Sequence, residues 1–302
     1  MRIAHITDPH WFVPPTWRDF SSFKRLVGTA NLYLRGRRHD FPASVKAHLV
    51  EHLLQIEPEL LILTGDITAT ALDAEFAAAV DQLGPALRRQ PSFVIPGNHD
   101  SYTDQAHKGR AIHRYFGEWM HAPPPDPSGR EGLPRLDIGD VTVLGIDPTR
   151  ATWLVASGEI PASQLAALER TLADPGLDGR MIVLAIHYPV LDRRGAVYDG
   201  HEHGLTNARH LIDVLERAKH RPVLILHGHE HHGFHQKLPM PDGGKIDVFN
   251  CGSSGYRRKP ESGRTAAMNV YDLQPGRVEV QRYQLGETGF EAELGGAYAT
   301  GR

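Results

Sequence analysis

Short apolar runs alternate with segments of helical periodicity along most of the chain. The runs are Arg2–Thr7, Leu60–Leu63, Ser92–Ile95, Val141–Ile146, Met181–Ile186 and Val223–Leu226. Most are nearly continuous in apolar residues and are bounded by Gly, Pro or Asp, which is typical of strands that are buried on both faces. Strands of this kind, separated by helices, predict a layered α/β domain.

The segments between these runs predict four helices. Residues Ala43–Ile56 repeat apolar positions at helical spacing and stop before a proline, and Ala71–Leu83 is rich in alanine. Residues Pro161–Leu172 place proline near the first turn, where its missing N–H group costs nothing. Asn207 is expected to cap a helix over Ala208–Ala218.

The pattern changes after residue 245. Residues Ile246–Asn250, Thr265–Leu273 and Arg277–Tyr283 read as strands without long helices between them. We therefore expect these three strands to build a second, partly antiparallel sheet. Residues 1–285 are expected to form one domain and residues 286–302 a C-terminal tail.

Composition narrows the class of protein. The chain has 302 residues, of which 40% are hydrophobic and 23% charged, so it is neither mostly disordered nor fibrous. Its net charge of −3 argues against a chain-wide polycation for nucleic acid. Cys251, as a single cysteine, excludes an internal disulfide. The sequence has no long apolar run and no secretory leader pattern, so we expect a cytoplasmic protein.

The 19 histidines outnumber the lysines, and many stand where predicted strands end. Residues that can bind metal ions occur in Asp8-Pro9-His10, Gly65-Asp66, Gly97-Asn98-His99-Asp100, His187-Tyr188-Pro189 and His227-Gly228-His229-Glu230-His231. Each stretch alone is compatible with an ordinary turn. Because ligands of open α/β sheets bind beyond the carboxyl ends of the strands, the five stretches together predict one metal-binding crevice.

This ordered set resembles the calcineurin-like metallophosphoesterase superfamily. Its motifs Asp-x-His, Gly-Asp, Gly-Asn-His-Asp/Glu, His and Gly-His-x-His are all present, and the resemblance covers roughly residues 1–283. It implies a four-layer α-β-β-α sandwich, in which two mixed sheets are flanked by helices. It also implies a catalytic domain with a dinuclear metal centre at the strand ends.

The resemblance assigns each motif residue a role. Asp8, His10 and His231 would bind the first metal, Asn98, His187 and His229 the second, and Asp66 would bridge the two. Such ligands suit Mn, Fe, Zn, Co or Ni better than Ca, and a metal-bridging hydroxide would attack phosphorus. His99 would stabilise or protonate the leaving oxygen. Asp100 would either orient His99 or cap the following turn.

The absence of certain motif residues narrows the range of possible substrates. Ala69 stands where purple acid phosphatases have a metal-binding tyrosine, and Pro96 where protein phosphatases have an arginine. The pattern looks like the bacterial cyclic-nucleotide and glycerophosphodiester phosphodiesterase branch, so we expect a small-molecule phosphodiester as substrate. The alternatives are a pyrophosphatase acting on a nucleotide-linked lipid of the UDP-sugar type and a broad-specificity phosphomonoesterase. A nuclease fits less well, because the chain lacks a long basic segment. A metal-free scaffold also fits less well, because every metal ligand of the motifs is present.

Residues 11–41 form a basic and aromatic insert directly after the first motif. Phe23, Leu26, Val27 and Ala30 lie on one helical stripe. The insert is compatible with a helical flap packed on the domain, a substrate lid, or a peripheral membrane contact through residues 18–38. A loop with His201 and His203 either faces the substrate or is a solvated connector. Assembly into a homo-oligomer is also compatible with the sequence.

Overall fold

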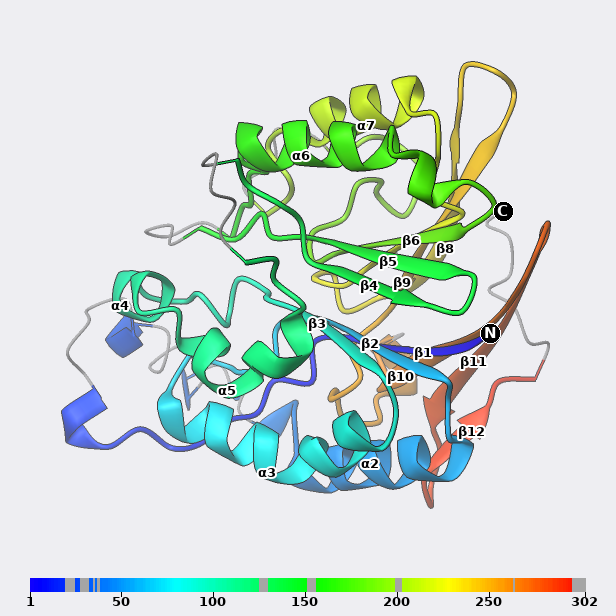
Figure 1. Cartoon of the computed structure of the whole chain (residues 1–302). Helices are drawn as coiled ribbons and strands as arrows, with labels where there is room; N and C mark the ends of the chain where they lie inside the picture. Colours follow the sequence, from blue (N-terminus) through cyan, green and yellow to red (C-terminus); the bar gives the residue numbers. More distant parts are fainter. Residues whose placement is uncertain are drawn as a thin grey trace.

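Two sheets face each other in the centre of the molecule, with helices on both outer sides (Figure 1). The computed structural model describes residues 1–19, 25–27, 33–34, 36, 39–124, 130–150, 156–198, 203–262 and 264–294. Each sheet has six strands and is mixed. The predicted sandwich of two mixed sheets flanked by helices is therefore confirmed.

The first sheet has the strand order β12-β11-β10-β1-β2-β3. Its strands are β1 (Arg2–Ile6), β2 (Leu60–Thr64), β3 (Ser92–Ile95), β10 (Ala267–Gln274), β11 (Arg277–Leu285) and β12 (Phe290–Ala292). Strands β1, β2 and β3 run parallel, whereas β10 pairs antiparallel with β1. The helices of this half are α2 (Ala43–Ile56), α3 (Asp73–Arg89), α4 (Asp104–Lys108) and α5 (Ala111–Met120). Of these, α2, α3 and α5 pack their buried residues against the sheet.

The second sheet has the strand order β4-β5-β6-β7-β9-β8. Its strands are β4 (Arg135–Ile138), β5 (Val141–Ile146), β6 (Met181–Ile186), β7 (Leu224–His227), β8 (Gly233–Pro239) and β9 (Lys245–Cys251). Helices α6 (Ala162–Leu172) and α7 (Ala208–Arg217) cover its outer face (Figure 1). Short 3-10 turns form at Trp17–Asp19, Pro175–Leu177 and Pro260–Ser262.

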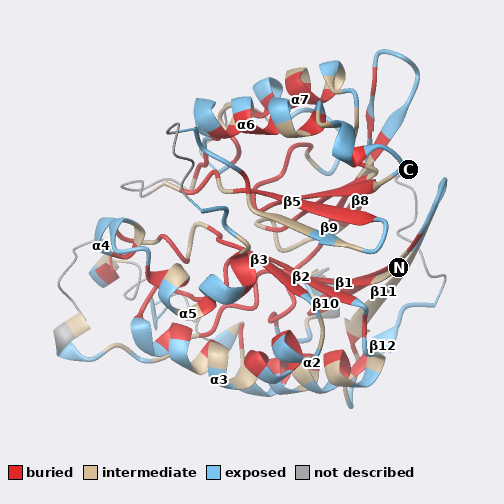
Figure 2. Ribbon diagram, viewed as in Figure 1, coloured by how far each residue is buried: buried red, intermediate tan, exposed pale blue. Residues whose placement is uncertain are grey.

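The central strands are buried on both faces (Figure 2). In β1, Ala4 and Ile6 pack under the helices, whereas Ile3 faces the other sheet. Phe93 of β3 and Phe249 of β9 belong to the same core between the sheets. Because such strands expose no face, they are apolar almost throughout, as the sequence pattern required.

The three C-terminal strands do not form a sheet of their own, so this prediction is wrong. Strand β9 joins the second sheet beside β7, whereas β10 and β11 extend the first sheet beyond β1. The main chain of Arg2 is opposite Asp272, so a pairing between the two ends of the chain completes the first sheet. Within residues 286–302, Phe290–Ala292 form β12 and pair with β11.

Two helix predictions need correction. Helix α3 continues through Pro85 to Arg89, because Ala86 and Leu87 keep its apolar face buried. The Asn207 side chain does not cap α7. Its Oδ1 accepts from the N–H of Ile160 at 3.0 Å and its Nδ2 donates to the Ile160 carbonyl at 2.9 Å. Asn207 therefore joins two loops rather than capping a helix.

Only part of the 11–41 insert lies within the described residues. The parts outside them are residues 20–24, 28–32, 35, 37 and 38, which include Phe23 and Ala30 of the predicted stripe. Leu26 of that stripe is 47% exposed. At the end of the insert, the buried Phe41 ring lies 4.5 Å from the His10 ring, centroid to centroid. Within the described ranges, no helix is both long and apolar enough to cross a membrane.

Candidate metal centre

The strand ends bring the predicted metal ligands together. Ligand atoms of Asp8, His10, Asp66 and His231 all lie within 4.8 Å of one another, and so do those of Asp66, His187 and His229. Asp66 belongs to both groups. The two groups could therefore hold two neighbouring ions that share one carboxylate.

Asn98 completes the second group. Its Oδ1 lies 3.1 Å from Nε2 of His187 and 2.9 Å from Nδ1 of His229. The predicted ligands thus converge from the ends of β1, β2, β3, β6 and β7. Sequence order placed them on five separate segments, and the parallel strands bring those segments to one edge.

Three of the histidine rings are oriented by carbonyl groups outside the cluster. Nδ1 of His10 lies 3.2 Å from the Thr68 carbonyl, and Nδ1 of His187 lies 2.7 Å from the Thr64 carbonyl. Nε2 of His229 lies 2.5 Å from the His203 carbonyl. A ring nitrogen that donates to a carbonyl leaves the other nitrogen with a free lone pair. His10 and His187 therefore present Nε2 to the cluster, whereas His229 presents Nδ1.

The donor set fits bound cations. Nε2 of His231 lies 3.0 Å from Nε2 of His10 and 3.2 Å from Oδ1 of Asp8. Oδ1 of Asp66 lies 3.4 Å from Nε2 of His187. Nitrogen and carboxylate lone pairs thus converge in a buried space, where unpaired polar groups are costly. Positive ions would satisfy all of these groups at once.

The pKa shifts show that the cluster is anionic. Burial acts to raise the pKa of Asp8, but the His231 ring lowers it to about 2. Burial likewise opposes ionisation of Asp66, but the neighbouring His187 holds the pKa of that carboxyl well below its usual range. Burial lowers the pKa of His229 to about 3, so its ring is neutral. At His187 the attraction of Asp66 exceeds the effect of burial and raises the pKa to about 9, so Nε2 carries a proton that a bound metal ion would displace. The carboxylates are therefore ionised at neutral pH, which is the form that binds metal.

Five of the seven predicted ligands have left-handed backbones. Their φ angles are 51° for Asp8, 48° for His10, 53° for Asp66, 73° for His229 and 55° for His231. This region is sparsely populated by residues other than glycine and is often found at functional sites. The left-handed residues turn the chain after β1, β2 and β7, and in the first and last of these motifs two residues reach the same cluster.

Two motif glycines are required by close packing against the ligands. A Cβ atom on Gly97 would lie 2.2 Å from Oδ1 of Asp66, and one on Gly228 would lie 2.3 Å from Oδ2 of Asp8. Both separations are far below a normal contact distance. The glycines before Asn98 and His229 therefore let neighbouring loops approach the carboxylates directly.

His99 lies beside the cluster. Its backbone N–H donates to Oδ1 of Asp66 at 2.8 Å, and its ring Nδ1 lies 2.6 Å from the Ala69 carbonyl. The ring also stacks on Tyr102 at a centroid distance of 5.5 Å. Nδ1 of the ring thus faces a carbonyl group, and the ring borders the cluster of predicted ligands.

Asp100 orients backbone rather than the His99 ring. Its buried carboxylate accepts from the N–H groups of Ile67, Thr68 and Gly97 at 3.2, 2.9 and 2.9 Å. Burial and the nearby Asp66 raise the pKa of Asp100 to about 7. Asp100 thus ties the loop after β2 to the loop after β3.

A cleft of about 490 Å³ opens above the cluster. Asp66, Asn98, His99, His229 and His231 line it, and further residues along its walls are Arg193, Tyr198, His203, Glu230, His232 and Arg264. The two arginines stand in loops without a recognisable motif, so the sequence pattern did not indicate them. His203 borders the cleft, which agrees with the interpretation of its loop as facing the substrate. His201 of the same loop lies outside the described residues.

Comparison with known proteins agrees with this arrangement. A family model described as calcineurin-like phosphoesterase matches residues 1–233. A dimetal phosphatase from Danio rerio has a similar fold, with a TM-score of 0.58, 12% identity, and coverage of 96% of this chain and 98% of that one. Purple acid phosphatase PPD1 from yellow lupin, Lupinus luteus, has a TM-score of 0.56 and 11% identity. That alignment covers 94% of this chain and 51% of the lupin chain. A search of curated proteins found no match. The chain belongs to the calcineurin-like phosphoesterase family.

Proposed function

We propose that the protein hydrolyses small-molecule phosphodiesters with two divalent transition-metal ions. The observation that carries the proposal is the shared carboxylate of Asp66, which belongs to both groups of ligand atoms. Asp8, His10 and His231 would hold one ion, and Asn98, His187 and His229 the other. When bound, two such ions supply positive charge for the phosphoryl oxygens and lower the pKa of a water molecule.

His99 would act on the leaving group. Because its Nδ1 faces the Ala69 carbonyl, the protonated ring carries its second N–H on Nε2. This N–H would donate to the ester oxygen as the bond to phosphorus breaks. Asp100 would hold the His99 backbone in place through the amides of the two loops that it joins.

Charge favours a diester over a monoester. Two divalent ions contribute four positive charges, and Asp8, Asp66 and a deprotonated nucleophile remove three. The remaining single positive charge is neutralised by a diester monoanion, whereas a monoester dianion exceeds it. This charge count supports the proposal that the chain belongs to the bacterial cyclic-nucleotide and glycerophosphodiester phosphodiesterase branch of the family.

The test compares bis(4-nitrophenyl) phosphate with 4-nitrophenyl phosphate on the Mn²⁺-loaded protein. We expect the diester to be hydrolysed faster, and faster turnover of the monoester would overturn the diester assignment. Asp66→Ala should remove both ions and abolish activity, because this carboxylate serves both groups. Full activity of thoroughly chelated protein would overturn the metal-dependent mechanism itself.

A pyrophosphate substrate is the second candidate, and the cleft wall favours it. Nε of Arg264 donates to Nε2 of His232 at 3.0 Å, and no carboxylate in the described part of the chain forms an ion pair with Arg264. Arg193 lies on the same cleft, with its Nε 3.7 Å from Glu230. Two arginines facing the cleft suit a substrate that carries a second anionic group.

The two candidates differ in their response to Arg264→Gln. For a UDP-sugar, whose two phosphates could reach both the metals and the arginines, we expect KM to rise about tenfold. For the aryl diester, KM should remain unchanged. Equal effects on both substrates would exclude Arg264 as a site for the second phosphate.

A further inference from the structure

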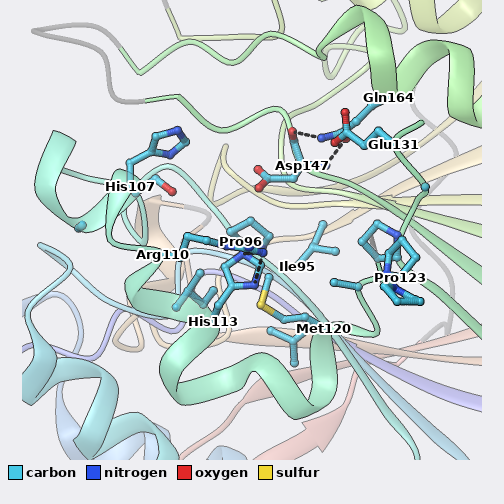
Figure 3. A pocket seen from close by; sticks show the side chains of 18 of the residues that line it. Ile95, Pro96, His107, Arg110, His113, Met120, Pro123, Glu131, Asp147 and Gln164 are labelled. Atoms are coloured by element: carbon cyan, nitrogen blue, oxygen red, sulfur yellow. Dashed lines mark hydrogen bonds between the residues drawn. The ribbon is translucent and has the colours of Figure 1, made fainter. Parts of the chain in front are cut away.

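A second cavity of about 420 Å³ lies beside the metal-binding cleft and is separate from it. It is bounded by the ends of β3 and β5, by α4 and α5, and by the segment around Pro123 (Figure 3). None of its described lining residues also lines the cleft above the metal ligands. Its volume is within the range of small-molecule sites.

Asp147 contributes a carboxylate to the lining of this cavity. Its Oδ1 accepts from the N–H and the hydroxyl of Thr149, at 2.9 and 2.6 Å. Within the residues that the structure describes, no donor reaches its other oxygen, Oδ2. Figure 3 shows the carboxylate pointing into the cavity. A carboxylate oxygen in this position requires an N–H or O–H donor from a ligand or from water.

The remaining walls suit a flat, partly polar ring. Ile95, Met120 and Pro123 supply apolar surface. Arg110 and His113 belong to the same lining, and Nη2 of Arg110 lies 3.1 Å from Nδ1 of His113. Burial and Arg110 lower the pKa of His113 to about 4, so this ring is neutral. Guanidinium and imidazole groups both stack on aromatic rings.

We propose that this cavity is a second binding site, which takes an amino-substituted heteroaromatic ring of the nucleobase type. The exocyclic amino group would donate to Oδ2 of Asp147, and the ring would lie against the apolar residues and the Arg110–His113 pair. Recognition by an acceptor favours rings with an amino group over rings that present a carbonyl at that position.

The cavity adjoins the loop that carries His99. The hydroxyl of Thr149 donates to Asp147, and Oγ of Ser101 lies 3.2 Å from that hydroxyl oxygen. Ser101 directly follows Asp100, which ties the loops of the metal centre together. An occupant of the cavity would thus contact the reverse side of the catalytic loop without entering the cleft.

The test uses nucleosides, because they carry no phosphate to compete at the metal ions. Guanosine, adenosine and cytidine are titrated by calorimetry into the metal-loaded full chain, with uridine as the matched probe that lacks an amino group. At least one amino nucleoside should bind about tenfold more tightly than uridine. Bound nucleoside should also slow amide hydrogen exchange in residues 104–124 of the unmodified protein.

Asp147→Asn should weaken the binding of that nucleoside about tenfold, because its amide can present a donor where the ligand needs an acceptor. Asp140→Asn, at an exposed aspartate in the turn between β4 and β5, is the matched control and should leave binding unchanged. The proposal is overturned if no amino nucleoside binds up to about 10 mM. Exchange protection confined to the residues of the metal cleft would also overturn it. Because the exchange measurement uses unmodified protein, the proposal can be refuted even if Asp147→Asn does not fold.

Discussion

Replacing Gly97 by alanine should disable the metal centre through a single methyl group. The new Cβ would lie 2.2 Å from Oδ1 and 2.3 Å from the backbone nitrogen of Asp66. The neighbouring loop has little room to retreat, because a Cβ on Gly65 would itself lie 2.4 Å from the nitrogen of Gly97. The methyl group must therefore displace the carboxylate that both groups of ligands share.

The size of the effect follows from the required movement. Restoring a normal contact requires a shift on the order of 1 Å, and a displacement of this size at a reacting centre can reduce turnover about 100-fold. Overpacking of this kind also costs about 1–3 kcal/mol of unfolding free energy. We therefore expect Gly97→Ala to bind metal less tightly and to be less stable than the unmodified protein.

Gly117→Ala is the matched control. Gly117 lies on the exposed side of α5, and an added Cβ there would have no described heavy atom within 4 Å. Alanine in a helix interior is favoured over glycine by about 1 kcal/mol, so this variant should be slightly more stable and fully active. Metal content, urea unfolding and aryl diester turnover are measured for both variants. If Gly97→Ala keeps both ions and normal turnover, the close packing of the two loops does not position Asp66.

Three further predictions use other parts of the structure. His99→Ala should keep its metal content but lose about 10²–10⁴-fold in turnover, least for good leaving groups; loss of metal would contradict a leaving-group role. Asn207→Ala should cost about 1–3 kcal/mol in urea unfolding, because it removes both bonds to Ile160; an unchanged midpoint would contradict this. Burial raises the pKa of Glu75 from 4.5 to about 7. Glu75 therefore binds its proton more tightly in the folded protein than in the unfolded chain. Its contribution to the free energy of unfolding falls by up to about 3 kcal/mol as the pH rises from about 4.5 to 7. Glu75→Gln should remove that part of the pH dependence. The free energy of unfolding is measured against pH for both proteins, and equal slopes would refute the prediction.

The sequence predicted the central strands well because burial on both faces produces a continuous apolar run. Strands β5 and β6 have the predicted bounds, and every one of their residues is buried. The edge strands β4 and β8 consist largely of half-buried and exposed positions, so they lack this pattern and were missed. The placement of β10 could not be predicted either, because its pairing with β1 joins residues about 270 positions apart.

The site shows the same division between local and distant determinants. Motif spacing predicted the convergence of Asp66 with its partners because each motif follows a strand. The part played by Asp100 depends on amides of Ile67 and Thr68, more than 30 residues away, so the sequence left two interpretations open. Arg264 has no motif, and only the folded cleft reveals it.

Backbone hydrogen bonds between neighbouring loops help to hold the strained loops in place. The N–H of Asp8 donates to the Gly65 carbonyl at 3.0 Å, and the N–H of His10 donates to the Asp66 carbonyl at 3.1 Å. The loops after β1 and β2 thus continue to pair beyond the strands, at positions where each left-handed residue costs about 1–3 kcal/mol. Because these bonds do not involve ligand side chains, Asp66→Ala should lose metal without unfolding. In the absence of metal, its thermal midpoint should lie slightly below that of chelated unmodified protein, because the His99 N–H loses its bond to Oδ1 of Asp66. Unfolding of the variant at room temperature would show that the carboxylate is essential to the fold.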